Sequence, residues 1–514
     1  MPSLSFAVSS HDHKNQDKIW VDFAKSLKAT RDISFSLDEI LEKETVSAAC
    51  KRYFSHVDAN SEKLPNNLHR DPEVVSDMLQ CGKWIFMFGN FSTKTAFPNH
   101  VLKALLDVFP DETGDNFEKL GFYTLPHIRE YPLGMEVAEG NPWGSVGPIV
   151  GKPLTLTCAA CHVGQMSDGR YAIGMPNQNL LFGKFNLLMM YNSWKVDREK
   201  YEEEKWPKKS QSYYKSMDKV LARSKSPLKF LFQAESLISR LRLGNFLGTY
   251  VGLISPTVGE LNTYFNLSPN QYYPSSPLFP LGLNKDINSE GMYMSTPTLW
   301  DIENFVNKAH TGKFRPLSAF IPTNSLEDFS KAAMIFQTGN QEFTTPKYID
   351  PLALYIRTLS TPKGPSIKSK KLFVQGKRIF IEKCKSCHDG PRGESLSPVS
   401  IKKIGTPEIL LNPFFDYEPP TESASLAYDN YVEVLGPIKK VEGVYSRPLK
   451  GLWSRKKLML NGSHHDIYES FCLKPLNTDD IHTAGPLKTE IHRDLCYDYF
   501  SYEKYALIEF LQAW

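Results

Sequence analysis

The sequence CAACH at residues 158–162 is matched by CKSCH at residues 384–388. In each stretch two cysteines are separated by two residues, and a histidine follows at once. Two thiols at this spacing can each add to one vinyl group of a porphyrin, and the histidine then reaches the iron. With 8 cysteines and 13 histidines in 514 residues, roughly 0.003 such motifs are expected by chance. The two copies therefore predict two covalently bound haem c groups.

Six residues make up these two predicted sites. They are Cys158, Cys161 and His162 at the first site, and Cys384, Cys387 and His388 at the second. Both histidines are the expected proximal ligands of iron. A zinc site fits less well, because paired C-x-x-C units in zinc sites typically lie ~15–20 residues apart and these lie 226 apart. A thioredoxin-like site needs neither the histidine nor a second copy.

Length and charge exclude several other classes of protein. A chain of 514 residues suggests two to four domains at roughly 150 residues each. Lysine and arginine total 60 against 57 aspartates and glutamates, which argues against a generally basic nucleic-acid binder. The sequence contains no uninterrupted apolar run of the length, about 18 residues or more, that predicts a spanning helix. We therefore expect a globular protein with neither a nucleic-acid partner nor a membrane span.

The other four cysteines form two local pairs, Cys50 with Cys81 and Cys472 with Cys496. Haem attachment of this kind takes place outside the bacterial inner membrane, where disulfides persist. Disulfides within each pair are the favoured interpretation, and four buried free thiols are the alternative. We expect a periplasmic or otherwise exported protein, although residues 1–18 lack the basic start and apolar core of a signal peptide.

Apolar periodicity predicts a mostly helical fold. Helices are expected over residues 71–88, 350–359 and 502–514, and a further helix over 370–383 leads directly into Cys384. The segment that follows the first histidine, 163–179, is expected to be a loop.

The sequence STPKGPS at 360–366 is the best candidate for a linker. A boundary there divides the chain into a helical extension, a larger first haem domain and a smaller cytochrome c domain. The corresponding ranges are 1–120, 121–365 and 366–514.

Four stretches resemble segments of the bacterial di-haem cytochromes c. That superfamily includes the di-haem cytochrome c peroxidases, the di-haem maturation enzyme of methylamine dehydrogenase and the rubber oxygenases. The stretches are LTCAACHVGQM (156–166), TPTLWDIE (296–303), SRPLKGLWSRKKLMLNGSHHDIYE (446–469) and EIHRDLCYDYFSYEKYALIEFLQAW (490–514). The resemblance implies two cytochrome c-like helical haem domains with long loops, of which the N-terminal one is enlarged.

The resemblance also suggests distal ligands, which sit opposite the proximal histidines. The family's histidine ahead of the last helix corresponds to His492, the candidate distal ligand of the second haem. Met459, 71 residues after His388, is the alternative distal candidate. Further rivals at the second haem are His464, His465 and His482. For the first haem, Met166 and Met175 lie too close in sequence to His162 to reach the opposite face easily. Met189, Met190, His127 and Trp194 are possible partners, none of them preferred, and the resemblance implies an open distal site there.

Two positions depart from the peroxidases of this superfamily. His310 stands where those enzymes have a tryptophan between the haems, which makes it the candidate catalytic residue at the inter-haem position. The segment 314–326 lacks the glutamine and glutamate that act as acid and base on peroxide in those enzymes.

We therefore expect an exported di-haem oxidoreductase. Its first haem reacts with peroxide or dioxygen, and its second haem relays electrons from a small cytochrome, a copper protein or a small-molecule substrate. The alternative is a non-catalytic electron-transfer protein in which both irons are six-coordinate. A third possibility is a structural or sensory haem protein.

Overall fold

The structure is a computed structural model of the 514-residue chain. The continuous ranges that it describes are 21–28, 30–59, 71–91, 97–125, 130–140, 151–180, 208–232, 326–338, 341–391, 448–456, 466–474 and 499–513. It also describes the shorter pieces 185, 188, 191, 299–300, 315–318, 321–323, 393, 395, 397, 399–400, 443–444, 446, 458 and 496.

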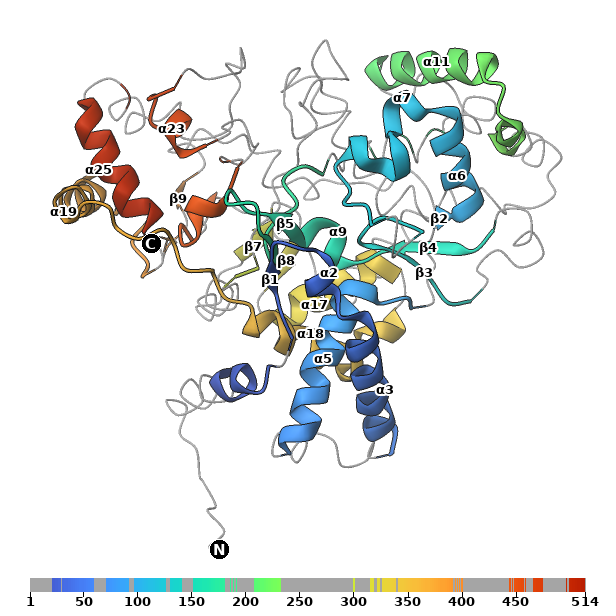
Figure 1. The fold of residues 1–514 in the computed structure, drawn as a ribbon, viewed down its shortest axis with the longest axis horizontal. Helices are drawn as coiled ribbons and strands as arrows, with labels where there is room; N and C mark the ends of the chain where they lie inside the picture. The colour runs from blue at the N-terminus through green and yellow to red at the C-terminus, as the bar shows by residue number, and fades with distance from the viewer. Residues whose placement is uncertain are drawn as a thin grey trace, which may run out of the picture.

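The described residues are mostly helical, with only short strands. Figure 1 shows α19, α23 and α25 at one end of the molecule and α6, α7 and α11 at the other. The helices α3 and α5 extend from the middle, where α9 and the strand β5 lie. The expected mostly helical fold is confirmed.

The first group of helices packs around α5 (Pro72–Phe88). Asp71 caps its start by accepting a hydrogen bond from the Glu73 amide at 2.9 Å. One side of α5 packs on α3 (Lys43–Ala59) and another on α18 (Pro346–Thr358). The other elements around this group are β1 (Ile33–Ser34), α2 (Asp38–Leu41), β7 (Arg315–Ser318), β8 (Ile321–Thr323), α17 (Leu326–Thr338) and η8 (Gln341–Thr344).

A second core, rich in aromatic rings, lies beside the first. It is built by α6 (Asn99–Val108), α7 (Pro110–Thr113), η2 (Asp115–Leu120), α11 (Lys208–Arg223) and η5 (Pro227–Lys229). Three short antiparallel strands in the order β2-β4-β3 border it: β2 (Phe97–Pro98), β3 (Met135–Val137) and β4 (Pro153–Leu156).

The strand β4 leads straight into α9 (Cys158–His162), which carries the first motif. The next residues form an antiparallel hairpin of β5 (Val163–Gln165) and β6 (Tyr171–Ile173), with β1 paired to the outer edge of β6. The expectation of a simple loop over 163–179 is therefore wrong. A turn in which the Met166 amide donates to the Arg170 carbonyl at 2.8 Å reverses the chain there, and its Gly169 adopts φ +91°.

The C-terminal elements have a core of their own, which joins α19 to α25. They are α19 (Lys370–Ile379), the single π turn η9 (Phe380–Cys384), β9 (Val399–Ser400), β10 (Gly443–Val444), η10 (Leu452–Ser454), α23 (Ile467–Ser470) and α25 (Ser501–Gln512).

The helices expected from periodicity are present as α5, α18, α19 with η9, and α25. Between α18 and α19 the chain runs without helix or strand, as the STPKGPS sequence predicts. Core residues from 24–91 and from 299–359 belong to one cluster, whereas the core residues on the C-terminal side of 365 form a separate one. Within the described ranges, no helix combines the length and the apolar character that crossing a bilayer requires.

Candidate cofactor-attachment sites

The first motif forms one helical turn pinned at both ends. The Thr157 amide donates to the Gly134 carbonyl at 2.8 Å, and the Thr157 hydroxyl donates to the Met87 carbonyl at 3.1 Å. An ideal Cβ on Gly134 would lie 2.2 Å from the Ala160 nitrogen, so only glycine permits this approach. The Asn177 amide donates to the Cys161 carbonyl at 2.8 Å. These contacts fix the backbone of the motif.

The two thiols of the first motif are free and lie in partly buried positions. Burial raises the pKa of Cys158 and of Cys161 to about 12. Both thiols are therefore protonated at neutral pH, which disfavours a role as a thiolate nucleophile. No disulfide joins Cys158 to Cys161, and the backbone of the motif is fixed by the hydrogen bonds given above.

A phenylalanine ring lies beside each histidine of the two motifs. The rings of Phe86 on α5 and His162 have centroids 6.5 Å apart, and those of Phe380 and His388 lie 6.4 Å apart. In both cases the phenylalanine comes from a buried helical turn, so the two sites share one local arrangement although they lie far apart in sequence.

At the second motif the orientation of the histidine is defined by a hydrogen bond. The His388 Nδ1–H donates to the Gly393 carbonyl at 2.5 Å, because a carbonyl oxygen can only accept. The tautomer is thereby fixed, and Nε2 is left as the nitrogen with a lone pair for a ligand bond. Burial lowers the pKa of His388 against the opposing effect of this hydrogen bond, which favours the neutral ring.

The cysteines of the second motif are also free and partly exposed. The π turn η9 ends at Cys384, whose carbonyl accepts from the amides of Cys387 at 3.0 Å and His388 at 2.9 Å. The backbone therefore curls so that both thiols and the histidine follow one another within a single turn. Burial, and then the charge of Cys387, raise the pKa of Cys384 to about 12.

Both residue sets fit a covalently attached haem. Each supplies two unpaired thiols and one histidine from a rigid turn, and His388 has its imidazole oriented by a backbone carbonyl. Among the described residues there is no cluster of three or more His, Cys, Asp or Glu side chains that alone could hold a metal ion. Haem brings its own four ring nitrogens to the iron, so the protein needs to supply only one or two axial ligands.

The expected disulfides are confirmed. Cys50 on α3 is bonded to Cys81 on α5, and Cys472 is bonded to Cys496. The first joins two helices of the N-terminal group, and the second ties the end of α23 to the segment before α25. All four motif cysteines are excluded from these pairs.

The remaining candidate residues mostly lie outside the described part of the chain. These are His310, Met459 and His492, together with the rivals His127, Met189, Met190, Trp194, His464, His465 and His482. Met166 and Met175 are described, and both are fully buried in the first core. The Met175 sulfur accepts a hydrogen bond from the Ser454 hydroxyl at 3.9 Å, so it is engaged in packing between the two halves of the chain.

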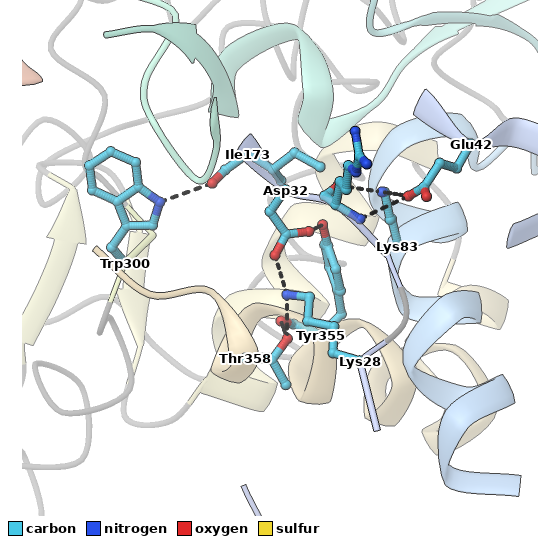
Figure 2. A network of polar contacts seen from close by, with 9 residues as sticks. Lys28, Asp32, Glu42, Lys83, Ile173, Trp300, Tyr355 and Thr358 are labelled. Carbon is cyan, nitrogen blue, oxygen red and sulfur yellow. Dashed lines mark hydrogen bonds and ion pairs between the residues drawn. The ribbon is translucent and has the colours of Figure 1, made fainter. Parts of the chain in front are cut away.

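A polar network that the sequence did not predict joins residues just before β1 to α18 (Figure 2). The Asp32 carboxylate accepts a hydrogen bond from the Tyr355 hydroxyl at 2.9 Å and forms an ion pair with Lys28. The Lys28 ammonium also donates to the Thr358 hydroxyl at 2.9 Å. The Asp32 carbonyl accepts from the Ile173 amide at 2.9 Å, which anchors β6 to the helical core.

Comparisons with protein-family models, with curated proteins and with solved structures each return no match for this chain.

Proposed function

We propose that the chain carries two covalently bound haem c groups and acts as an exported di-haem oxidoreductase. The observation that carries the proposal is at the second motif, where the Nδ1–H of His388 donates to the Gly393 carbonyl beside two free cysteines. This is the arrangement that an axial histidine needs, since the opposite nitrogen must point its lone pair at the iron.

The residues that would hold the groups are the six of the two motifs. When bound, haem supplies one-electron chemistry and, where the sixth position is open, a site for peroxide or dioxygen. The protein itself orients the His388 imidazole, places an apolar core beside each motif and keeps the motif thiols out of disulfides. We assign the reaction with peroxide or dioxygen to the first site, and the relay of electrons to the second.

His492 is our candidate for the distal ligand of the second haem, with Met459 as the alternative. His310 is the candidate catalytic residue between the haems. Replacement of His492 by alanine is expected to change the spectrum of the second haem and to leave that of the first unchanged. Identical spectra before and after the substitution would remove His492 from the ligand set.

The second site has a surface suited to a small redox partner. Five exposed residues at helical spacing run along α19 and the following turns: Lys371, Val374, Arg378, Ile381 and Lys385. Val374 is 66% exposed and Ile381 is 51% exposed. A stripe of alternating basic and apolar side chains complements a partner with an acidic rim around an apolar centre. We propose a small acidic cytochrome or copper protein as that partner.

The test of the stripe is the ionic-strength dependence of electron transfer from such a donor. The double variant Lys371→Glu and Arg378→Glu is expected to slow transfer at low salt and to have a much smaller effect at high salt, because screening removes the charge contribution. If the double variant and the unchanged protein transfer electrons at equal rates at low salt, the partner does not dock on this stripe.

The decisive test of the proposal is the haem count. The chain is produced with a cytochrome c maturation system, denatured, and assayed for haem that remains attached. Two equivalents are expected for the unchanged chain, one for Cys158→Ala with Cys161→Ala, and one for Cys384→Ala with Cys387→Ala. The matched control, Cys472→Ser with Cys496→Ser, also removes two cysteines but should retain both equivalents. A chain without attached haem overturns the proposal.

The ferric spectrum then separates the oxidoreductase from the electron carrier. A high-spin component beside a low-spin one means one open iron and supports an enzyme, whereas two low-spin haems in both redox states mean a carrier.

A further inference from the structure

We propose that Tyr355 is a redox-active residue of the first site, which gives one electron to the oxidised first haem while Asp32 takes its phenol proton. This inference rests on the proposed function, because it supposes haem at the first motif and a reaction of that haem with peroxide. It concerns two residues outside both motifs, and the contacts of one buried phenol carry it.

Tyr355 is enclosed on α18 with a base in contact. It is 1% exposed, and its hydroxyl donates to Asp32 Oδ1 at 2.9 Å (Figure 2). Burial, and then the charge of Asp32, raise the pKa of Tyr355 well above its ordinary value, so the phenol is protonated at neutral pH. A phenol that loses an electron becomes a strong acid, and the Asp32 carboxylate is in place to receive its proton.

A second aromatic ring joins Tyr355 to the first motif. Phe86 on α5 is fully buried, and its ring centroid lies 5.8 Å from that of Tyr355 and 6.5 Å from that of His162. The planes of the first two rings meet at 66° and those of the second two at 54°. The phenol and the expected proximal imidazole are therefore only two ring contacts apart, and an electron can tunnel across so short a packed path.

The accepting carboxylate is held from several sides. Asp32 forms an ion pair with Lys28, whose ammonium donates to the Thr358 hydroxyl at 2.9 Å. That hydroxyl donates in turn to the Tyr355 carbonyl at 2.7 Å. The backbone of Asp32 is fixed as well, since its carbonyl accepts from the Ile173 amide at 2.9 Å. The proton can therefore cross one hydrogen bond with little movement of the heavier atoms.

The charge of Lys28 is the reason that the proton must move with the electron. Its ammonium lies 4.8 Å from the centre of the Tyr355 ring. A cation at this distance stabilises the electron-rich ring and opposes the loss of an electron alone. Transfer of the phenol proton to Asp32 leaves an uncharged tyrosyl radical, which the cation disfavours far less than a charged one.

The step balances in atoms and electrons. Over the whole reaction, hydrogen peroxide takes up two electrons and two protons and gives two waters. Tyr355 lends one of these electrons to the first haem, its O–H bond breaks, and the proton forms a bond to Oδ1 of Asp32. When the electron donor returns an electron to Tyr355, the proton moves back. Tyr355 thus stores one oxidising equivalent inside the N-terminal group of helices.

The experiment detects the radical by electron paramagnetic resonance. The matured, fully oxidised protein is mixed with an equimolar amount of hydrogen peroxide and frozen. We expect a signal that narrows when the protein is made with ring-deuterated tyrosine, because deuterium couples to the unpaired electron more weakly than hydrogen does. Tyr355→Phe should lose this signal. Asp32→Asn keeps an acceptor oxygen but cannot take the proton, and it should lower the yield about tenfold or more.

The matched control is Tyr191→Phe. Tyr191 is also fully buried, and its hydroxyl also donates to a carboxylate, Asp218 Oδ1, at 2.7 Å. Its ring packs on Phe109 and Phe232 in the second core, whereas Phe86 belongs to the first. The signal should therefore be unchanged in this variant. A signal that disappears in Tyr191→Phe and persists in Tyr355→Phe overturns the proposal.

Different outcomes separate this proposal from the proposed function. Chains without attached haem overturn both at the haem count. Suppose instead that two haems are attached and their spectra change with peroxide. A signal that deuterated tyrosine leaves unchanged, or that Tyr355→Phe retains, then overturns the role of Tyr355 and leaves the proposed function standing.

Two further observations distinguish a redox role from a merely structural one. Loss of the radical in Tyr355→Phe, with unchanged ferric spectra and an unchanged reaction of the haem with peroxide, supports the redox role. If Tyr355→Phe does not fold, Asp32→Asn provides the test, and an unchanged yield in it overturns the proposal. Deuteration alters no contact, so its result stands whether or not either variant folds.

Discussion

Gly376 on α19 lies so close to Ala506 on α25 that the two helices touch backbone to backbone. An ideal Cβ on Gly376 would be 1.9 Å from the Ala506 carbonyl oxygen and 2.9 Å from the Phe510 Cβ. Backbone atoms of a helix cannot move aside as a side chain can. This contact sets the separation of the two helices that precede and cover the second motif.

Gly376→Ala is therefore expected to destabilise the C-terminal domain by about 1–3 kcal/mol or more, through overpacking. Thermal unfolding followed by near-ultraviolet circular dichroism measures the loss. Gln375→Ala, one residue away on the same helix, is the matched control and should leave the midpoint nearly unchanged. Equal midpoints for Gly376→Ala and the unchanged protein would mean that the helices separate without cost.

The number of free thiols gives a second prediction. Two disulfides and the two proposed haems would together occupy all eight cysteines, so the matured chain should show no free thiol when denatured without reductant. Reductant should then release the four disulfide cysteines only, because thioether bonds to haem resist it. Alkylation followed by mass spectrometry counts them. Four free thiols before reduction would mean that the motif cysteines carry nothing.

Lys83 provides a third prediction, on stability. Its side chain is fully buried and its ammonium donates to Glu42 Oε2 at 2.6 Å and to the Arg31 carbonyl at 2.8 Å. Burial lowers the pKa of Lys83, and Glu42 opposes that shift. Lys83→Met should cost about 1–3 kcal/mol, because it removes the Lys83 donor from the Arg31 carbonyl and the neutralising charge from the Glu42 carboxylate, which keeps the Arg31 amide as a donor at 3.0 Å.

Chemical denaturation measures the loss of unfolding free energy. Two further variants test whether burial of the Lys83–Glu42 pair is its cause. Lys103→Met removes one side of a pair in which Lys103 is 46% and Glu130 is 63% exposed, and it should cost at most about 1 kcal/mol. Adding Glu42→Gln to Lys83→Met should restore part of the lost stability, since the two sites interact directly. If Lys103→Met lowers the free energy of unfolding as much as Lys83→Met does, burial of the ion pair is not the reason for the loss.

Asp466 gives a prediction about pH. Burial opposes its ionisation, but hydrogen bonds from Lys474 and from the amides of Glu469 and Tyr468 outweigh this and lower its pKa. A lowered carboxyl pKa adds stability above the ordinary value of about 3.9, and that stability is lost as the pH falls through the folded-state value.

The unchanged protein should therefore exceed Asp466→Asn in stability by at most about 1 kcal/mol near pH 7, since asparagine still caps the helix and the ion pair is exposed. The difference should shrink towards zero below about pH 4. Denaturation at both pH values measures it. A difference that grows on acidification would contradict the direction of the shift.

Local signals in the sequence predicted much of this structure. The apolar periodicity of 71–88 and of 370–383 predicted helices because their buried residues recur on one face, and the paired spacing of the outer cysteines predicted both disulfides. The hairpin after His162 was missed, although Ser167-Asp168-Gly169 is a turn sequence, because its strands are only three residues long.

The contacts between the hairpin and the C-terminal elements could not be predicted from the sequence. The Trp300 ring packs against Gly174 and Gly451, each more than a hundred residues away in sequence. The periodicity of apolar residues predicts local helices and strands but not such long-range contacts. The position of Lys83 is similar, since a lysine on a helix is ordinarily solvated and only the packing of α5 makes it buried.

The hydrogen bonds between the hairpin and the C-terminal elements can form only after residues 453–456 have been made. The Ser167 hydroxyl donates to the carbonyl of Trp453, 286 residues later, and Gln178 accepts from the amide of Lys456, 278 residues later. A growing chain therefore presents its first motif long before the segment that closes over the hairpin has been made. A group that attaches to Cys158 and Cys161 can therefore be added before residues 453–456 cover the hairpin.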